Sequence, residues 1–139
     1  MKLVTRKPLL EKMTSEDIEI IVPIIIKMFK LKSNKDTILK TKNIVTFINT
    51  KKKILGFKTA FNSQRLQKVV NYIRTNSLLP IISTSTGYYY SFDRQDILEM
   101  ILNFESRIEA MVLAKEGLRY IITQEKVKEL EKDLLWNML

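Results

Sequence analysis

The chain of 139 residues contains no cysteine and no histidine. Without cysteine there is no disulfide framework, no thiolate nucleophile and no cysteine-based zinc site. Without histidine, the most common general base and transition-metal ligand are also missing. The three glycines, Gly56, Gly87 and Gly117, lie too far apart to form a glycine-rich loop that cradles phosphate. The sequence therefore predicts a protein that is not an enzyme and needs no cofactor or metal.

Long hydrophobic runs are also missing. The longest apolar run, Ile20–Ile26, is interrupted by Pro23 and is far shorter than the roughly 18 residues that a membrane-spanning helix needs. The N-terminus is basic but has neither a long apolar core nor a small-residue cleavage site, so it does not resemble a signal peptide. We therefore expect a cytoplasmic protein without a membrane partner, and one domain with an appended helix.

Acidic residues are scarce in the first part of the chain. Residues 1–80 contain 17 Lys and Arg against 5 Asp and Glu, whereas residues 81–139 contain 7 against 10. Between Lys32 and Asn76 the only acid is Asp36, against eleven basic residues. Charge concentrated in this way favours a polyanionic partner, most often nucleic acid. Charge that serves only solubility is the alternative, and it requires no such segregation.

The rest of the chain is best interpreted around residues 63–76. Asn62 or Ser63 can cap a helix there by accepting a hydrogen bond from a free backbone N–H. Apolar residues recur behind the cap at helical spacing and predict a buried face: Leu66, Val69, Val70 and Ile73. The other side carries amide and basic groups without a carboxylate: Gln64, Lys68 and Asn71, flanked by Arg65, Gln67 and Tyr72. Such a helix can enter a DNA major groove, although an ordinary amphipathic surface helix explains the pattern equally well.

Two helices are expected before this segment. Thr14 or Ser15 can cap the first, whose main part runs over residues 22–31 with Pro23 in its first turn and Ile24, Ile25 and Met28 on its inner face. Thr41 can cap the second, which extends to about Lys52 and buries Ile44, Phe47 and Ile48. The polar segment over residues 32–40 is interpreted as a loop.

Residues 78–91 predict a β-hairpin. Two β-prone runs, 78–83 and 88–91, flank a small polar turn that ends in Gly87. The tip has no acid and offers hydroxyl groups that can bind phosphate oxygens. Because side chains alternate along a strand, Tyr88 and Tyr90 should face one way and Tyr89 the other, with at least one of them in the core.

Two helices are expected after the hairpin. Asp93 can cap a long one that ends before Gly117, with a main apolar stripe of Ile97, Ile101, Phe104, Ile108, Met111 and Val112. Three further leucines lie a quarter-turn or more away and can meet a second subunit, although one broad core contact is an equal alternative: Leu98, Leu102 and Leu113. A tail helix over 123–139 should dock on the long helix of its own subunit or of a partner through Val127, Leu130, Leu134 and Met138.

The order helix, helix, capped helix, hairpin is that of a winged-helix domain, a helix-turn-helix with a β-wing. Two runs carry the resemblance: Leu66-Gln67-Lys68-Val69-Val70-Asn71-Tyr72-Ile73-Arg74, then Leu79-Pro80-Ile81-Ile82-Ser83-Thr84-Ser85-Thr86-Gly87-Tyr88-Tyr89. They resemble small winged-helix proteins of phages and prophages, in which a recognition helix ending in an I-N-x-I/L-R type motif leads into P-I-x-S-x-x-x-G-Y-Y and a long helix. The resemblance covers roughly residues 44–107, and the wing motif is its most specific part.

The resemblance implies a mainly α fold with a small β-hairpin. With the rest of the chain, this divides the sequence into an N-terminal arm over residues 1–13, a winged-helix domain over residues 14–92 and long C-terminal helices over residues 93–139. The arm and the tail after Gly117 lie outside the resemblance. It also implies duplex-DNA binding, often by dimers, in transcription regulation or replication of a phage or mobile element. Leu130 and Leu134 then join Leu98, Leu102 and Leu113 as predicted contacts with a second subunit or another partner.

On this resemblance, the recognition helix begins at Ser63 and approaches base edges with Gln64, Gln67, Lys68 and Asn71. Phosphates are contacted by Arg65, Arg74, Lys51, Lys52, Lys53 and Lys58. The wing tip touches the DNA backbone or an adjacent minor groove through Ser83, Thr84, Ser85 and Thr86. Its contribution should be modest, because the wing has no Lys or Arg.

Other functions stay open as alternatives. Carboxylate pairs such as Asp93 and Asp96, or Glu105 and Glu109, can in principle support Mg²⁺ or acid–base chemistry, but capping and solvation explain them better. An adaptor in a replication or transcription complex would use the C-terminal helices and would not need the basic charge of residues 32–76. RNA is a weaker alternative, because a recognition helix suits the B-form major groove better than the deep, narrow groove of A-form RNA.

Overall fold

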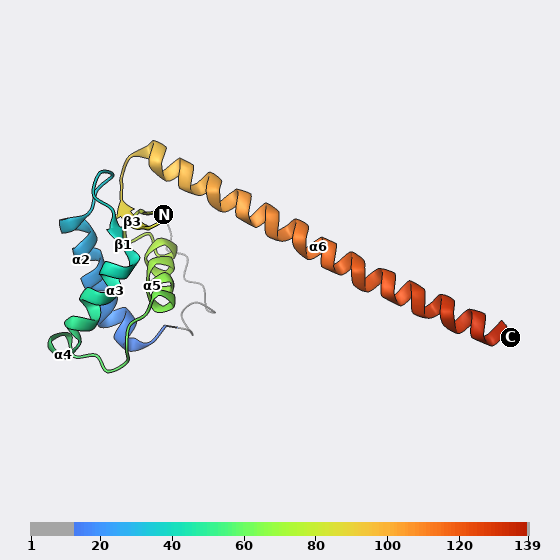
Figure 1. Cartoon of the computed structure of the whole chain (residues 1–139). Helices are drawn as coiled ribbons and strands as arrows, with labels where there is room; N and C mark the ends of the chain where they lie inside the picture. Colours follow the sequence, from blue (N-terminus) through green and yellow to red (C-terminus); the bar gives the residue numbers. More distant parts are fainter. Residues whose placement is uncertain (1–12, 139) are drawn as a thin grey trace. The chain divides into compact units, whose positions relative to one another are not determined.

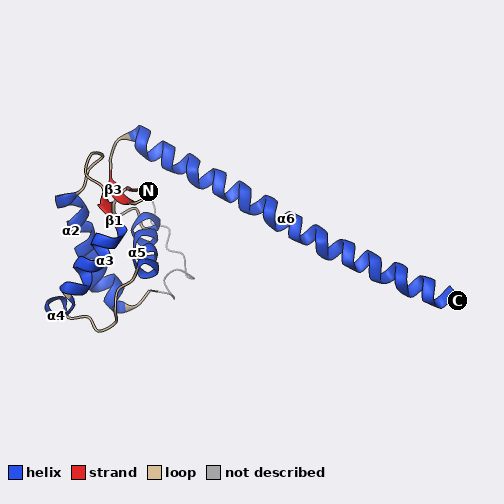
Figure 2. Ribbon diagram, viewed as in Figure 1, coloured by secondary structure: helices blue, strands red, loops and turns tan. Residues whose placement is uncertain are grey.

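The computed structural model describes residues 13–138, so the predicted arm over residues 1–13 lies outside it except for Met13, which is buried in the core. The described chain is mainly helical, with a small three-stranded antiparallel sheet and one long C-terminal helix (Figures 1 and 2). It divides into two compact units, of which the first ends at Leu98 and the second begins at Glu99. The expectation of a mainly α fold with a β-hairpin is confirmed.

The first helix begins with two reciprocal hydrogen bonds, in which the Thr14 hydroxyl accepts from the Asp17 N–H at 3.1 Å and the Asp17 carboxylate accepts from the Thr14 N–H at 3.3 Å. A π-helical turn, η1 (Asp17–Ile21), runs directly into α2 (Val22–Lys32). Pro23 lies in the first turn of α2, as predicted, where its missing N–H costs no hydrogen bond.

The buried face of α2 differs from the prediction. Val22, Ile25 and Phe29 are buried, whereas Ile24 and Met28 are only partly covered. Apolar residues occupy nearly every side of this helix. Periodicity alone therefore does not select a face, and the elements that pack against α2 decide it.

The second predicted helix is shorter than expected. It is α3 (Thr41–Thr50), in which Thr41 is the first helical residue rather than the cap, and it ends before Lys52. The short helix α4 (Lys52–Leu55) follows, and Gly56 ends it in the left-handed conformation at φ 79°. Ile44 and Ile48 are buried as predicted, but Phe47 is 43% exposed, so its predicted burial is wrong.

The central helix, α5 (Ser63–Thr75), forms as predicted. Asn62 is its cap, because its Oδ1 accepts a hydrogen bond from the Arg65 N–H at 2.8 Å. The predicted apolar face is fully buried: Leu66, Val69, Val70 and Ile73. The chain leaves the helix through Ser77, which takes the left-handed conformation at φ 54°.

The hairpin consists of β2 (Ile81–Ser83) and β3 (Gly87–Tyr90), as predicted. A third strand, β1 (Leu39–Lys40), lies in the segment predicted as a loop and pairs with β3, which gives the strand order β1-β3-β2. Two residues are too few for alternation to indicate a strand. Gly87 allows this pairing, because a Cβ there would lie 2.1 Å from the backbone oxygen of Leu39.

The core of the first unit lies between α2, α3, α5 and the sheet, which Figure 1 shows gathered together. Tyr89 is buried, and Tyr88 and Tyr90 are partly buried against the main core on the other side of the strand. The Tyr88 ring meets the ring of Phe29 edge to face at 6.4 Å. The predicted alternation of the tyrosines is confirmed.

The C-terminal region is one continuous helix, α6 (Arg94–Met138), of 45 residues. Asp93 caps it as predicted, since its Oδ1 accepts from the Gln95 N–H at 2.7 Å. The helix continues through Gly117, so the prediction that the long helix ends before this residue is wrong. The prediction of a separate tail helix over 123–139 that docks on the long helix of its own subunit is also wrong, because these residues continue α6. One glycine costs about 1 kcal/mol relative to alanine in a helix, which is too little to end it here.

Asp96 joins the beginning of α6 to Ser91, the residue after β3, and to Lys35 in the 34–37 turn. This buried carboxylate accepts a hydrogen bond from Ser91 Oγ at 2.8 Å and lies 3.3 Å from Lys35 Nζ. The Ser91 bond and then the Lys35 interaction lower the pKa of Asp96 below its usual value. The same contact with Asp96 raises the pKa of Lys35.

These shifts predict a pH window for the Asp96→Asn variant. A carboxylate with a lowered folded-state pKa stabilises the fold above its unfolded pKa of about 4, and that stabilisation is lost as the pH falls through the folded pKa. In urea unfolding across a pH series, the stability gap between wild type and Asp96→Asn should be widest from about pH 4 to about pH 10. This difference in stability between wild type and Asp96→Asn should become smaller in acid. A gap of constant size down to the lowest pH would contradict this role.

Candidate nucleic-acid interface

One long stretch of the first unit carries no negative side chain. From Thr37 to Phe92 the chain contains nine Lys and Arg and no Asp or Glu. This stretch includes α3, α4, α5 and the hairpin. A segment with such an excess of positive charge attracts a polyanion. Two carboxylates from outside the segment contact it, since Glu16 Oε1 accepts a hydrogen bond from the Lys58 N–H at 2.7 Å and Asp17 pairs with Arg65.

The outer face of α5 carries polar and basic side chains at helical spacing. Gln64, Gln67, Lys68 and Asn71 follow the i, i+3, i+4, i+7 pattern, and all four are exposed. The burial of the opposite face directs these four side chains outward. Gln and Asn can bond adenine bidentately, and Lys can bond guanine. The structure therefore brings together the residues predicted to approach base edges, and Ser63 in the first turn is exposed as well.

A clamp between α3 and the segment before α5 helps to position α5. Asn49 Nδ2 donates to the Phe61 carbonyl oxygen at 2.7 Å, and the Phe61 N–H donates to Asn49 Oδ1 at 2.9 Å. The buried Phe61 ring extends this anchor into the core. Asn49 cannot be recognised from the sequence, because one asparagine on a helix gives no local signal of a partner 12 residues away.

Arg65 does not fit its predicted contact with phosphate. Its side chain is 12% exposed, and its Nε donates to Asp17 Oδ1 at 2.6 Å. Its Nη1 donates to the Thr59 carbonyl oxygen at 2.8 Å, and the guanidinium lies 5.7 Å from the ring centroids of Phe57 and Phe61. Arg65 thus joins α5 to η1 inside the domain.

Arg74 and two of the four hydroxyl-bearing residues predicted at the wing tip, Ser83 and Thr84, also form hydrogen bonds inside the domain. Arg74 Nε donates to the Ile81 carbonyl oxygen at 2.9 Å, and its Nη2 donates to Ser83 Oγ at 2.6 Å. The Thr84 hydroxyl accepts from the Gly87 N–H at 3.1 Å and so closes the hairpin turn. These bonds do not fit the predicted DNA contacts of the three side chains. The exposed hydroxyl-bearing residues of the tip are Ser85 and Thr86.

The lysines before α5 remain accessible to an anion. Lys51, Lys53 and Lys58 are exposed, and Lys52 is partly covered. Lys51 Nζ lies 5.9 Å from the ring centroid of Phe47. Within residues 13–138, none of these lysines forms an ion pair with a carboxylate. Their predicted contact with phosphates is compatible with this arrangement.

No known family model, curated protein or solved structure matches this chain. The part of the chain that the structure describes contains no group of three or more carboxylate, histidine or cysteine side chains that could hold a metal ion. None of its helices is both long and apolar enough to cross a lipid bilayer.

The continuity of α6 places the predicted partner contacts on one side of one helix. Each residue of an α-helix is rotated by about 100° from the one before it. On this basis the side chains of the predicted partner contacts all point into one sector about 100° wide: Leu98, Leu102, Leu113, Leu130 and Leu134. All five side chains are exposed, by 39% to 66%. The main stripe, about a quarter-turn away, also has several exposed members: Ile101, Ile108, Met111 and Val112. The helix α6 thus presents two exposed apolar faces, so the alternative of one broad core contact is wrong for these residues.

Proposed function

We propose that this chain is a winged-helix protein that binds double-stranded DNA with α5 as its recognition helix. The outer face of α5 carries this proposal, since it presents three amide side chains and one ammonium group within a stretch free of Asp and Glu. The B-DNA major groove, about 12 Å wide, admits an α-helix and displays a distinct donor and acceptor pattern for each base pair. Amide and ammonium groups match that pattern.

The element order supports the winged-helix assignment. The helices α2, α3 and α5 and the β2–β3 hairpin follow one another as in the phage and prophage proteins that the sequence resembles. The hairpin is attached to the helices through β1 and through the two hydrogen bonds of Arg74. A wing held in this way can lie against a duplex beside the recognition helix, with Ser85 and Thr86 near phosphate oxygens.

The proposed contacts with DNA are of two kinds, contacts with bases and contacts with phosphates. Gln64, Gln67, Lys68 and Asn71 supply base recognition, and the lysines before α5 supply phosphate contacts that carry no sequence information. Arg65 and Arg74 position the helix and the wing instead of touching DNA. Much of the affinity then depends on salt, because phosphate contacts release counterions.

The helix α6 supports a homodimer. A helix in water gains most of its stability by packing its apolar face, and the main stripe of α6 is exposed along several turns. Two copies that bury this stripe against each other would present two recognition helices to two half-sites. We propose a dimer of this kind in transcription regulation or replication of a phage or mobile element.

Fluorescence anisotropy with a labelled random-sequence duplex tests the proposal. Lys68→Glu places a carboxylate opposite the polyanion and should weaken binding at least about tenfold, or ~1.4 kcal/mol. Lys128→Glu is the matched control, since it reverses the same charge on the side of α6 that carries neither apolar face. Equal losses in the two variants, or no binding of the wild type at low salt, would contradict the proposal.

A salt series separates phosphate contacts from base contacts. The logarithm of the wild-type binding constant should fall with the logarithm of salt concentration by about 0.9 per phosphate contact. Lys53→Gln should lower this slope by about one, whereas Gln67→Ala should leave the slope unchanged. An A-form RNA duplex of the same length should bind more weakly than DNA.

A further inference from the structure

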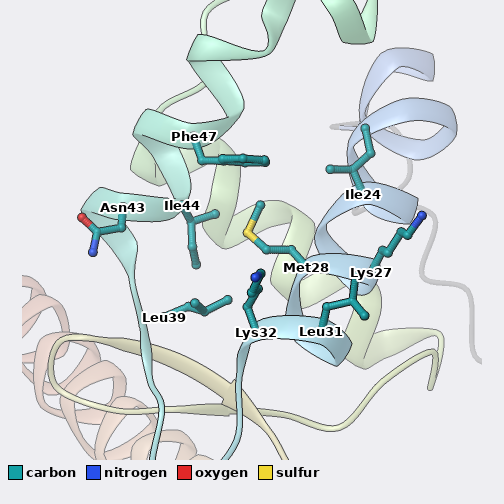
Figure 3. A pocket seen from close by; sticks show the side chains of 9 residues that line it. All are labelled: Ile24, Lys27, Met28, Leu31, Lys32, Leu39, Asn43, Ile44 and Phe47. Atoms are coloured by element: carbon teal, nitrogen blue, oxygen red, sulfur yellow. The ribbon is translucent and has the colours of Figure 1, made fainter.

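An apolar groove lies between α2, β1 and α3 in the first unit (Figure 3). Its volume is about 380 Å³, within the range of roughly 300–1,000 Å³ that is typical of ligand sites. Ile44 is buried beneath it, while Leu31 and Phe47 at its edges are 68% and 43% exposed. Three residues that are less buried than predicted all line this groove: Ile24 and Met28, which are partly covered, and Phe47, which is exposed. The apolar surface that they leave uncovered is available to another occupant.

The dimensions and charge of the groove indicate what fits it. Along α2 it extends from Ile24 to Lys32, which corresponds to about 12 Å of helix. A helix bound in a groove places apolar anchors at i, i+3 or i+4, and i+7, which span about 10.5 Å. Lys27 and Lys32 are among the lining residues and no carboxylate is. The fitting occupant is therefore a helix with three apolar anchors and a neighbouring carboxylate.

The C-terminal part of α6 has these properties. Val127, Leu130 and Leu134 stand at i, i+3 and i+7 and are 41%, 62% and 63% exposed. Glu131 lies at the flank of this face, and residues 125–133 contain four carboxylates against three lysines. We propose that this segment of α6 docks into the α2–α3 groove of a second copy of the chain.

The length of α6 requires that the groove belong to another copy. Leu130 lies 36 residues after Arg94, so about 54 Å of continuous helix separates them. A unit that ends at Leu98 is about 30 Å across. Leu130 therefore cannot reach a groove within its own first unit while α6 remains a single helix.

The docking face is also distinct from the proposed dimer seam. Val127, Leu130 and Leu134 begin 15 residues, or about 22 Å of helix, after Val112, the last residue of the main stripe. Their mean direction is also roughly 80° around the helix from that of the main stripe, so a partner helix packed on residues 97–112 does not cover them. The docking therefore adds a second contact between copies. It does not depend on DNA binding, and the two can be tested independently.

Disulfide crosslinking tests the docking directly, because the native chain has no cysteine. Full-length Leu31→Cys chain is mixed with affinity-tagged Leu130→Cys chain, oxidised and resolved on a non-reducing gel. A mixed covalent dimer is expected, since a disulfide needs Cα atoms within about 7 Å. Tagged Glu125→Cys replaces Leu130→Cys in the control, because residue 125 lies on the opposite side of the helix, and its yield should be at least tenfold lower.

A charge reversal in the same assay tests the role of the lysines. Lys32→Glu in the Leu31→Cys chain should lower the yield of mixed dimer several-fold, and Glu131→Lys in the Leu130→Cys chain should restore it. Lys32 and Glu131 are exposed, so both changes leave the cores intact. Equal yields with Leu130→Cys and Glu125→Cys, or a charge reversal that leaves the yield unchanged, would overturn the proposal.

Discussion

Replacing Arg65 by leucine is expected to lower the free energy of unfolding by about 3–5 kcal/mol. The variant leaves Asp17, only 3% exposed, as a buried charge without the guanidinium that now lies 2.6 Å from it. It also removes the hydrogen bond to the Thr59 carbonyl oxygen and the contacts over two aromatic rings. Urea unfolding followed by circular dichroism measures the loss.

A double-mutant cycle separates the ion pair from general packing. Asp17→Asn removes the charge that Arg65→Leu leaves unpaired, so the double variant should be less destabilised than the two single losses added together. Lys68→Leu is the control on the same helix, and its cost should stay within about 0.5 kcal/mol because that side chain is exposed. An Arg65→Leu cost as small as that of Lys68→Leu would contradict the internal role of Arg65.

The same variant distinguishes positioning from DNA contact. If Arg65 acts only inside the domain, the folded fraction of Arg65→Leu keeps every phosphate contact. Its salt slope in the anisotropy assay should therefore equal that of wild type, even where its apparent affinity is reduced by unfolding. A slope lower by about one would return Arg65 to the set of phosphate contacts.

Glycine-to-alanine substitutions should have opposite effects at Gly87 and Gly117. At Gly87 the added Cβ would lie 2.1 Å from the backbone oxygen of Leu39 and 2.7 Å from the Cα of Lys40. Backbone atoms in paired strands cannot move aside without separating β1 from β3. We expect Gly87→Ala to lower the free energy of unfolding by at least about 3 kcal/mol, at the upper end of overpacking effects.

At Gly117 no atom lies within 4 Å of the added Cβ, and the residue is within α6. Alanine has the higher helix propensity by about 1 kcal/mol, so Gly117→Ala should increase helicity and raise the melting temperature. Circular dichroism at the helical minimum during thermal unfolding compares both variants under one condition. A stabilising Gly87→Ala would contradict the close approach of β1 to β3, and a destabilising Gly117→Ala would contradict a continuous α6.

The structural features that could be predicted from the sequence depend on residues that are close together along the chain. A cap acts on N–H groups within one turn, so Asn62 and Asp93 could be recognised from the residues that follow them. A buried helical face repeats every three to four residues, which was sufficient for the four apolar residues of α5. The β2–β3 hairpin is signalled by its turn. By contrast, β1 is only two residues long and pairs with a strand almost fifty residues later, so no local pattern marks it.

The sequence by itself determined the helices α2, α3 and α5, the hairpin, the outward polar face of α5 and the concentration of positive charge. Only the tertiary structure decided which cations are available to a ligand. Arg65 and Arg74 turn inward because Asp17, 48 positions away, and the Ile81 carbonyl lie within their reach. Tertiary packing also decided which face of α2 is buried, and thereby left the groove beside Phe47. Periodicity describes one element, whereas burial depends on which other element covers it.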